Sequence, residues 1–173
     1  MYQHSNRYKI LRVFFDRPNK KYHLRELSRI TKISLPSVKK HVTELLKQDL
    51  VKVVNSGLYK GYKSSLSKKY KLLKRNDLLL RLEESGLIKK LEDIFTPNCI
   101  VLYGSAIEGL DDERGDIDIF VQSSKKNIDF KKYENKLNRT ISIIFEPNIT
   151  KIDKNFKNTL SNGIMLKGFL KVI

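Results

Sequence analysis

The sequence predicts an α+β protein of two small domains joined by a helical linker, and three observations lead to this prediction. Positive charge is concentrated in the first part of the chain. That part shows apolar residues at helical spacing and then a short β-rich stretch. The second part has short apolar runs typical of buried strands, which favour a small sheet. The expected domains are residues 1–65 and 98–173, with residues 66–97 as the linker.

Length and composition exclude several classes of protein. The chain has 173 residues, 40% hydrophobic and 31% charged, which is a globular composition that suits two modest cores. No apolar run approaches the roughly 20 residues that a membrane span requires. The polar N-terminus leads into no apolar signal region. We therefore expect no membrane partner and a cytoplasmic location.

The cysteine and histidine content gives no metal site. Cys99 is the only cysteine, which excludes an intramolecular disulfide and a thiolate zinc cluster. We expect Cys99 to act as a small buried apolar residue. His4, His23 and His41 are too scattered to predict a metal site from their spacing.

The net charge of +16 is unevenly distributed along the chain. Residues 1–69 contain 17 Lys and Arg against 4 Asp and Glu, whereas the rest of the chain is nearly balanced. A basic segment beside a nearly neutral one favours a polyanion-binding module, with nucleic acid as the leading partner. The alternative is that the lysines only form solvated faces.

Two helices are expected near the N-terminus. Residues 6–15 carry apolar side chains at three- and four-residue spacings, as an amphipathic helix does. A second, shorter helix over residues 24–30 has apolar residues on one side and Arg25, Glu26 and Arg29 on the other.

A third helix follows after a short turn. Ser34 is a suitable N-cap, and Pro36 in the first turn is compatible with a helix start. The residues expected on its buried side are Val38, Val42, Leu45 and Leu46. Its other side carries Ser37, Lys39, Lys40, His41 and Thr43.

A β-hairpin is expected directly after the third helix. Residues 50–54 are β-rich, and Asn55, Ser56 and Gly57 tolerate the backbone of a tight turn. Residues 58–63 form the returning strand and contain Lys60 and Lys63. The predicted hairpin is therefore strongly basic.

The segments YHLRELSR (22–29) and SLPSVKKHV (34–42), followed by this hairpin, resemble the winged helix-turn-helix regulators of archaea and bacteria. The resemblance implies binding of double-stranded DNA, with the third helix in the major groove and the hairpin along the backbone. The residues expected at phosphates are Lys39, Lys40, Lys60 and Lys63, and those expected at base edges are Ser37, His41 and Thr43. The alternative is a winged helix that binds protein.

The linker is strongly helical in composition. Residues 66–95 hold more leucines than one helix face needs, and Ser85 with Gly86 interrupts the pattern. We expect two helices here. They either hold the domains rigidly or mediate a homodimer.

A short motif in the second domain carries candidate chemistry. The apolar run 99–103 reads as a buried strand and leads into Gly104 and Ser105, after which a helical turn is expected. Alternation along residues 116–121 places Asp116 and Asp118 on one face of a second strand. Two neighbouring carboxylates favour a shared cation such as Mg²⁺. Backbone N–H groups after Gly104 suit phosphates, since the glycine lets a nucleotide approach closely.

The unit from Leu102 through Gly109 to Ile119 resembles the minimal nucleotidyltransferases of the DNA polymerase β superfamily. The resemblance implies a small mixed sheet, and it implies that Gly104 and Ser105 bind the triphosphate of ATP or another NTP. It also implies that Asp116 and Asp118 are catalytic and hold Mg²⁺.

Active members of this superfamily commonly add a third carboxylate from a later strand. In this chain that strand is expected over residues 140–145, where Thr140 and Ser142 face outward and Glu146 comes only at the end. The third carboxylate is therefore missing or displaced. The acidic run 111–113 is expected to be a solvated turn, and no spacing requires Glu108 in the site.

This chain resembles a group of archaeal and bacterial proteins in which a winged helix is fused to a minimal nucleotidyltransferase domain. The first hypothesis is an enzyme that transfers AMP from ATP to a protein or nucleic-acid hydroxyl. The second is a DNA-binding regulator, antitoxin-like, with a degenerate site that senses a nucleotide or binds none. The third is a purely structural protein-interaction role.

Overall fold

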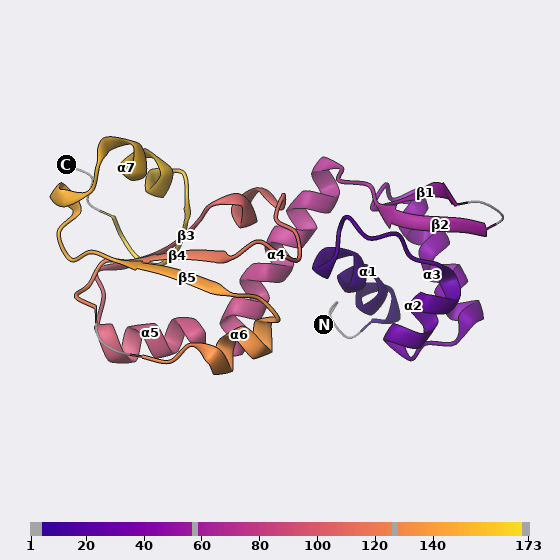
Figure 1. Ribbon diagram of the computed structural model, residues 1–173, viewed down its shortest axis with the longest axis horizontal. Coiled ribbons are helices and arrows are strands. Elements are labelled where there is room, and N and C mark those ends of the chain that lie inside the picture. Colours follow the sequence, from indigo (N-terminus) through magenta and orange to yellow (C-terminus); the bar gives the residue numbers. More distant parts are fainter. Residues whose placement is uncertain (1–4, 57–58, 126–127, 171–173) are drawn as a thin grey trace. The chain divides into compact units, whose positions relative to one another are not determined.

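The computed structural model describes residues 5–56, 59–125 and 128–170, and the chain divides into two compact units. The N-terminal unit is Met1–Lys74 and the C-terminal unit is Arg75–Ile173 (Figure 1). Helices and two separate sheets make up the described part of the chain, so the predicted α+β class is confirmed. Among the described residues, no helix is both long and apolar enough to cross a bilayer.

Three helices form most of the N-terminal unit: α1 (Asn6–Asp16), α2 (Leu24–Thr31) and α3 (Leu35–Lys47). The Oγ of Ser5 accepts a hydrogen bond from the N–H of Tyr8 (3.2 Å) and so caps α1. Ser34 occupies the N-cap position of α3, as expected, but its side chain makes no capping hydrogen bond. Proline in the first turn is compatible with the start of α3. It has no N–H, but an N–H in the first turn has no carbonyl partner within the helix, so no hydrogen bond is lost.

The predicted hairpin is present as strands β1 (Val51–Ser56) and β2 (Tyr59–Ser64), which pair antiparallel. Of the expected turn, Gly57 lies outside the described residues. The segment before α2 extends the hairpin, because the N–H groups of Tyr22 and Tyr62 each donate to the other's carbonyl at 2.8 Å. The start of α2 is thereby fixed against β2.

The core of the N-terminal unit lies between its three helices and includes the start of α4 (Lys68–Ser85). Tyr70 of α4 is fully buried there, and its hydroxyl donates to the carbonyl of Phe14 (2.7 Å). Leu78 and Leu82, farther along the same helix, belong to the core of the C-terminal unit. The expected linker residues therefore contribute to both cores. The predicted break is present, since Gly86 has φ +78° and precedes α5 (Leu87–Phe95).

A four-stranded mixed sheet with the order β5-β4-β3-β6 organises the C-terminal unit. Its strands are β3 (Cys99–Tyr103), β4 (Ile117–Val121), β5 (Ile141–Phe145) and β6 (Ile164–Gly168). The β4–β5 pair is parallel, whereas β3 runs antiparallel to both β4 and β6. The prediction of a small mixed sheet is confirmed.

Helices cover both faces of this sheet (Figure 1). On one face, α5 and α6 (Lys131–Leu137) pack with the later part of α4 over Ile100, Ile117 and Ile119. On the other, α7 (Lys154–Ser161) packs over Val101 and Phe120. Cys99 lies in this second core, where burial raises the pKa of its thiol, so the predicted buried role is confirmed.

Candidate functional site

The two predicted aspartates lie at one end of β4, on the face that α7 partly covers. Asp116 directly precedes the strand, and Asp118 is its second residue. Asp118 pairs in register with Tyr103 of β3 and with Ser142 of β5. Because side chains at paired positions of neighbouring strands share a face, Asp118 has Tyr103 on one side and Ser142 on the other.

Gly104 lies directly against Asp118. Its backbone has φ +78° and ψ −164°, a conformation that favours glycine. A Cβ at this position would overlap Oδ2 of Asp118 and would lie 3.2 Å from its Cγ. The space beside Gly104 was expected to admit a nucleotide. It is instead occupied by the Asp118 carboxylate. Two predicted site residues are in this way brought into contact.

Ser105 begins a single 3₁₀ turn, Ser105–Glu108, rather than an α-helix. The turn closes when Gly109 adopts the left-handed conformation and its N–H donates to the carbonyl of Ala106 (3.2 Å). Ser105 and Glu108 are both exposed. The hydroxyl of Ser105 is accessible to a phosphate. The N-terminus expected to bind phosphate belongs only to this short turn and not to a longer helix.

Burial and mutual repulsion act on the aspartate pair. Partial burial, and then the charge of Asp116, raise the pKa of Asp118, while Arg139 and a hydrogen bond from Ser142 oppose the rise. Burial and the Asp118 charge also raise the pKa of Tyr103. A divalent cation bound to oxygen ligands would relieve this repulsion, so the donor set fits Mg²⁺.

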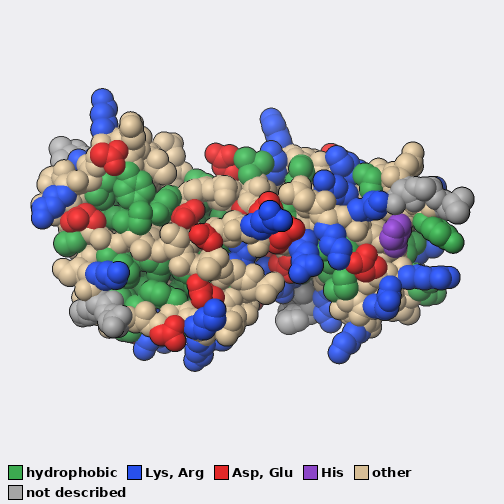
Figure 2. Space-filling view, viewed as in Figure 1, with side chains coloured by type: hydrophobic (Ala, Val, Ile, Leu, Met, Phe, Trp, Pro, Cys, Tyr) green, Lys and Arg blue, Asp and Glu red, His purple; other side chains and the backbone are tan. Residues whose placement is uncertain are grey.

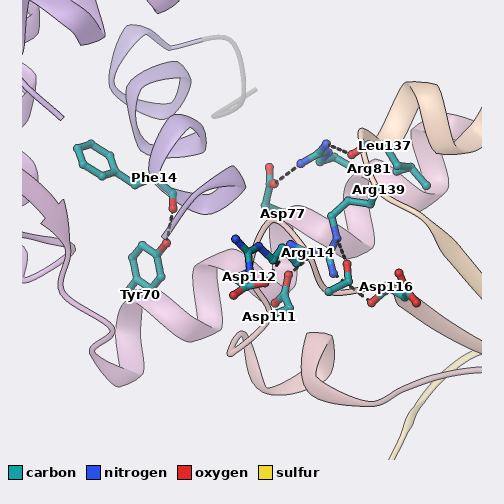
Figure 3. A network of polar contacts seen from close by, with 11 residues as sticks. Phe14, Tyr70, Asp77, Arg81, Asp111, Asp112, Arg114, Asp116, Leu137 and Arg139 are labelled. Carbon is teal, nitrogen blue, oxygen red and sulfur yellow. Dashed lines mark hydrogen bonds and ion pairs between the residues drawn. The ribbon is translucent and has the colours of Figure 1, made fainter. Parts of the chain in front are cut away.

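The loop before Asp116 is held by a buried ion pair that the sequence did not predict (Figure 3). The side chains of Arg139 and Asp111 are only 12% and 3% exposed, and they pair directly. The Nε of Arg139 donates to the carbonyl of Gly115 (2.7 Å), and its Nη2 donates to that of Asp116 (3.1 Å). The expectation of a solvated turn over residues 111–113 is therefore wrong for Asp111. The pair was not predictable because its members are 28 residues apart.

Hydroxyl groups occupy the positions where a third carboxylate was expected. Thr140 donates to Oδ1 of Asp116 (2.6 Å), and Ser142 bonds to Asp118. Glu146 follows β5 at its far end, about 13 Å along the strand from Ser142 at roughly 3.3 Å per residue. Within the described parts of the chain, no group of three or more His, Cys, Asp or Glu could hold a metal. The expectation of a missing or displaced carboxylate therefore agrees with this geometry.

The N-terminal unit has a hollow of about 1140 Å³ between α2, the start of α3 and strand β2. We call it the basic hollow. Its lining consists of Lys20, His23, Leu24, Arg25, Glu26, Arg29, Ile30, Leu35, Lys39, Tyr59, Lys60 and Tyr62. Figure 2 shows Lys and Arg side chains over much of the visible face of this unit, with apolar side chains among them.

The positions of the predicted DNA contacts differ from one another. Lys39 and Lys60 line the basic hollow, whereas Lys40 is exposed beside it on α3. Lys63 lies three residues after Lys60, so the strand pleat directs it to the other face of the hairpin. The hydroxyl of Thr43 is exposed but already donates to the carbonyl of Lys39 (2.9 Å).

The other two predicted base readers lie on a flank of α3. Ser37 and His41 are only partly exposed and lie four residues apart on one side of the helix. The Nδ1 of His41 is 3.2 Å from Glu44, which also lies 3.9 Å from Arg7 of α1. This ion-pair group lies on the side of α3 that faces α1. His41 and Ser37 do not line the basic hollow.

Arg25 and Arg29 are candidate contacts that were not predicted from the sequence. Both are exposed, line the basic hollow and lie one helical turn apart on α2. Their spacing on the polar side of α2 was the available signal. Only the tertiary structure brings them next to Lys39 and Lys60.

Comparison of the chain with protein-family models, with curated proteins and with solved structures gave no match.

Proposed function

We propose that this protein is a cytoplasmic DNA-binding protein with a nucleotidyltransferase site. In this proposal the N-terminal unit is a winged helix-turn-helix and the C-terminal unit is a minimal nucleotidyltransferase domain. The site transfers AMP from ATP, or the nucleotide of another NTP, to a hydroxyl of a protein or nucleic acid. The observation that carries the proposal is the contact of Asp118 with Gly104, beside Asp116 on the same face of the sheet.

Asp116 and Asp118 are the residues that would hold Mg²⁺, which supplies charge neutralisation at the triphosphate when bound. Hydrogen bonds from Thr140 and Ser142 orient the two carboxylates before any ligand arrives. Ser105 is exposed at the end of β3 and can donate its hydroxyl to a phosphate oxygen. Asp111 and Arg139 hold the loop that carries Asp116.

The proposed reaction exchanges one bond at the α-phosphorus. The acceptor hydroxyl oxygen forms a bond to that phosphorus, and the bond to the bridging oxygen of pyrophosphate breaks. The hydroxyl proton passes to solvent. Binding both reactants on one rigid sheet would supply much of the rate gain, because positioning lowers the entropic barrier.

The N-terminal unit supports DNA binding through charge. Within the described residues, Arg25, Arg29, Lys39 and Lys60 have no carboxylate partner, although they lie around one hollow. Unpaired cations grouped in this way repel each other and favour a polyanion. Double-stranded DNA fits, because cations that replace its condensed counterions gain affinity from counterion release.

The hydroxyls of Thr140 and Ser142 favour a second candidate function. A site with two carboxylates and, among the described residues, no third one grouped with them resembles a transferase that has lost its base. The protein would then be a transcriptional regulator, antitoxin-like, whose C-terminal unit senses a nucleotide. A homodimer is compatible with both candidates.

The test is label transfer from α-³²P-ATP with Mg²⁺ by the full chain. The acceptors offered are the protein itself, RNA and a cell extract. Asp116→Asn removes one proposed metal ligand, and Glu113→Gln is the matched control because Glu113 is an exposed carboxylate in the same loop. A parallel reaction with γ-³²P-ATP separates nucleotidyl transfer from phosphoryl transfer.

Label from the α-position that is lost in Asp116→Asn but kept in Glu113→Gln supports the transferase. ATP binding without label supports the sensing regulator. If ATP neither binds nor transfers label at millimolar concentration, the proposed role of the C-terminal unit is overturned.

A further inference from the structure

The lining of the basic hollow includes exposed apolar side chains, which DNA phosphates alone do not explain. Ile30 is 50% exposed, Leu35 is 39% exposed and Tyr59 is 74% exposed, and all three line the hollow. A second, smaller hollow of about 480 Å³ adjoins it and also includes Leu35. Exposed apolar side chains gathered at one place mark a binding surface more often than a chance arrangement.

The rim of the basic hollow is positively charged. Its one acidic residue, Glu26, is paired with Lys20 at 2.8 Å, and this bond holds the pKa of Glu26 below its ordinary value. The remaining rim cations have no partner among the described residues. The occupant must therefore combine negative charge with an apolar group.

The hydrogen-bonding side chains of α3 are poorly placed to read bases in this hollow. His41 is held by Glu44, and the hydroxyl of Thr43 is donated to the backbone of its own helix. The residues of α3 that do line the hollow are Leu35 and Lys39. Leu35 is the first residue of the helix, and N-terminal residues of a recognition helix are those that reach base edges.

Thymine is the base that offers an apolar group in the major groove, its C5-methyl. Resting on the proposed DNA binding, we infer that Leu35 and Ile30 read thymine methyl groups, while the surrounding cations bind the phosphates. The protein accordingly prefers A·T-containing duplexes. Leu35 and Ile30 are specificity-determining residues of this interface.

The test compares a short A·T-rich duplex with the same duplex in which uracil replaces every thymine. This exchange removes only the methyl groups and leaves base pairing unchanged. Affinity of the full chain is measured by fluorescence anisotropy at several salt concentrations. We expect uracil to weaken binding about fourfold for each buried methyl group.

Leu35→Ala should reduce the difference between thymine and uracil, because only Ile30 would still read methyl groups, while leaving the salt dependence unchanged. The matched control is Leu72→Ala, which truncates a leucine of similar exposure (47% against 39%) outside the hollow and should keep the difference. Conversely, 5-methylcytosine in a G·C-rich duplex should raise affinity more for the wild type than for Leu35→Ala. Circular dichroism confirms that each variant is folded.

Salt-dependent binding with equal affinity for thymine and uracil would overturn methyl recognition while leaving the proposed DNA binding in place. The same conclusion follows if Leu35→Ala keeps the full preference, because the methyl groups would then be read elsewhere. Absence of any salt-dependent DNA binding would overturn the DNA-binding function and methyl recognition together.

Discussion

The two units of this protein use charge in opposite ways. Met1–Lys74 contains 19 Lys and Arg against 4 Asp and Glu, whereas Arg75–Ile173 contains 16 against 15. In the first unit, exposed cations surround a hollow and lack partners among the described residues. In the second, several charges are paired, and one pair, Asp111 with Arg139, is buried.

This difference determines how sensitive each unit is to substitution. Exposed cations act together through a long-range field, so each one contributes modestly and salt weakens them all. A buried charge depends on one neighbour, and removal of that neighbour leaves it unsatisfied at a cost of several kcal/mol. We therefore expect the largest single effects in the C-terminal unit. Four predictions test this expectation.

The largest effect is expected from Arg139→Ala. The change removes the buried ion pair of Arg139 with Asp111 and its hydrogen bonds to the carbonyls of Gly115 and Asp116, so the C-terminal unit should lose about 3 kcal/mol or more of unfolding free energy. Hydrogen exchange measured by mass spectrometry should show faster exchange in β3, β4 and β5, with α1 and α3 unchanged. Lys131→Ala is the control, because the Lys131 side chain is 72% exposed and its pair with Glu134 contributes little. Equal effects of the two changes would contradict the prediction.

Gly104→Ala should have the next largest effect. The added Cβ would overlap the Asp118 carboxylate, so we expect a destabilisation of about 1–3 kcal/mol and loss of Mg²⁺-dependent ATP binding. Calorimetric titration measures the binding. Gly86→Ala is a close control, since Gly86 also has φ +78° but has no atom within 4 Å of the added Cβ. If the control lost ATP binding too, backbone strain and not Asp118 would be the cause.

The double variant Lys39→Ala with Lys60→Ala addresses the N-terminal unit. We expect DNA affinity to fall about tenfold or more, and the slope of log affinity against log salt to decrease by about 2. ATP binding should be unchanged. Lys89→Ala with Lys90→Ala removes the same charge from exposed positions in the C-terminal unit. A similar loss of DNA affinity in that control would mean that net charge alone drives binding.

The smallest effect is expected from Asp118→Asn in the metal-free protein. Because the folded-state pKa of Asp118 is raised, its charged form destabilises the fold. That penalty grows as pH rises from the unfolded pKa through the folded pKa, and it is absent in acid. Asp118→Asn should therefore raise the melting temperature slightly at neutral pH, and the gain should vanish as the pH falls towards 4.

The effect of added Mg²⁺ on the melting temperature also tests the role of Asp118. It should stabilise the wild type by mass action but not Asp118→Asn, since the variant lacks a proposed ligand. A lower melting temperature for Asp118→Asn at neutral pH would contradict the assigned repulsion between Asp116 and Asp118.

Local patterns predicted much of the fold and part of the site. Helical spacing predicted the first helix over residues 6–15, and the structure has it over Asn6–Asp16. Strand alternation predicted that Asp116 and Asp118 share one face. In the structure they form hydrogen bonds there with Thr140 and Ser142. The break at Gly86 was also predictable, because Ser-Gly weakens a helix wherever it occurs.

The sequence by itself determined the order of helices and strands, the imbalance of charge and the shared face of the aspartate pair. These follow from the backbone periods of 3.6 and 2, which are written in neighbouring residues. Only the tertiary structure decided that Asp118 fills the space above Gly104, that Arg139 reaches Asp111, and that Leu35 joins Lys60 in one hollow. Such contacts depend on strand register and helix packing. Both are determined jointly by many side chains that are distant from one another in the sequence.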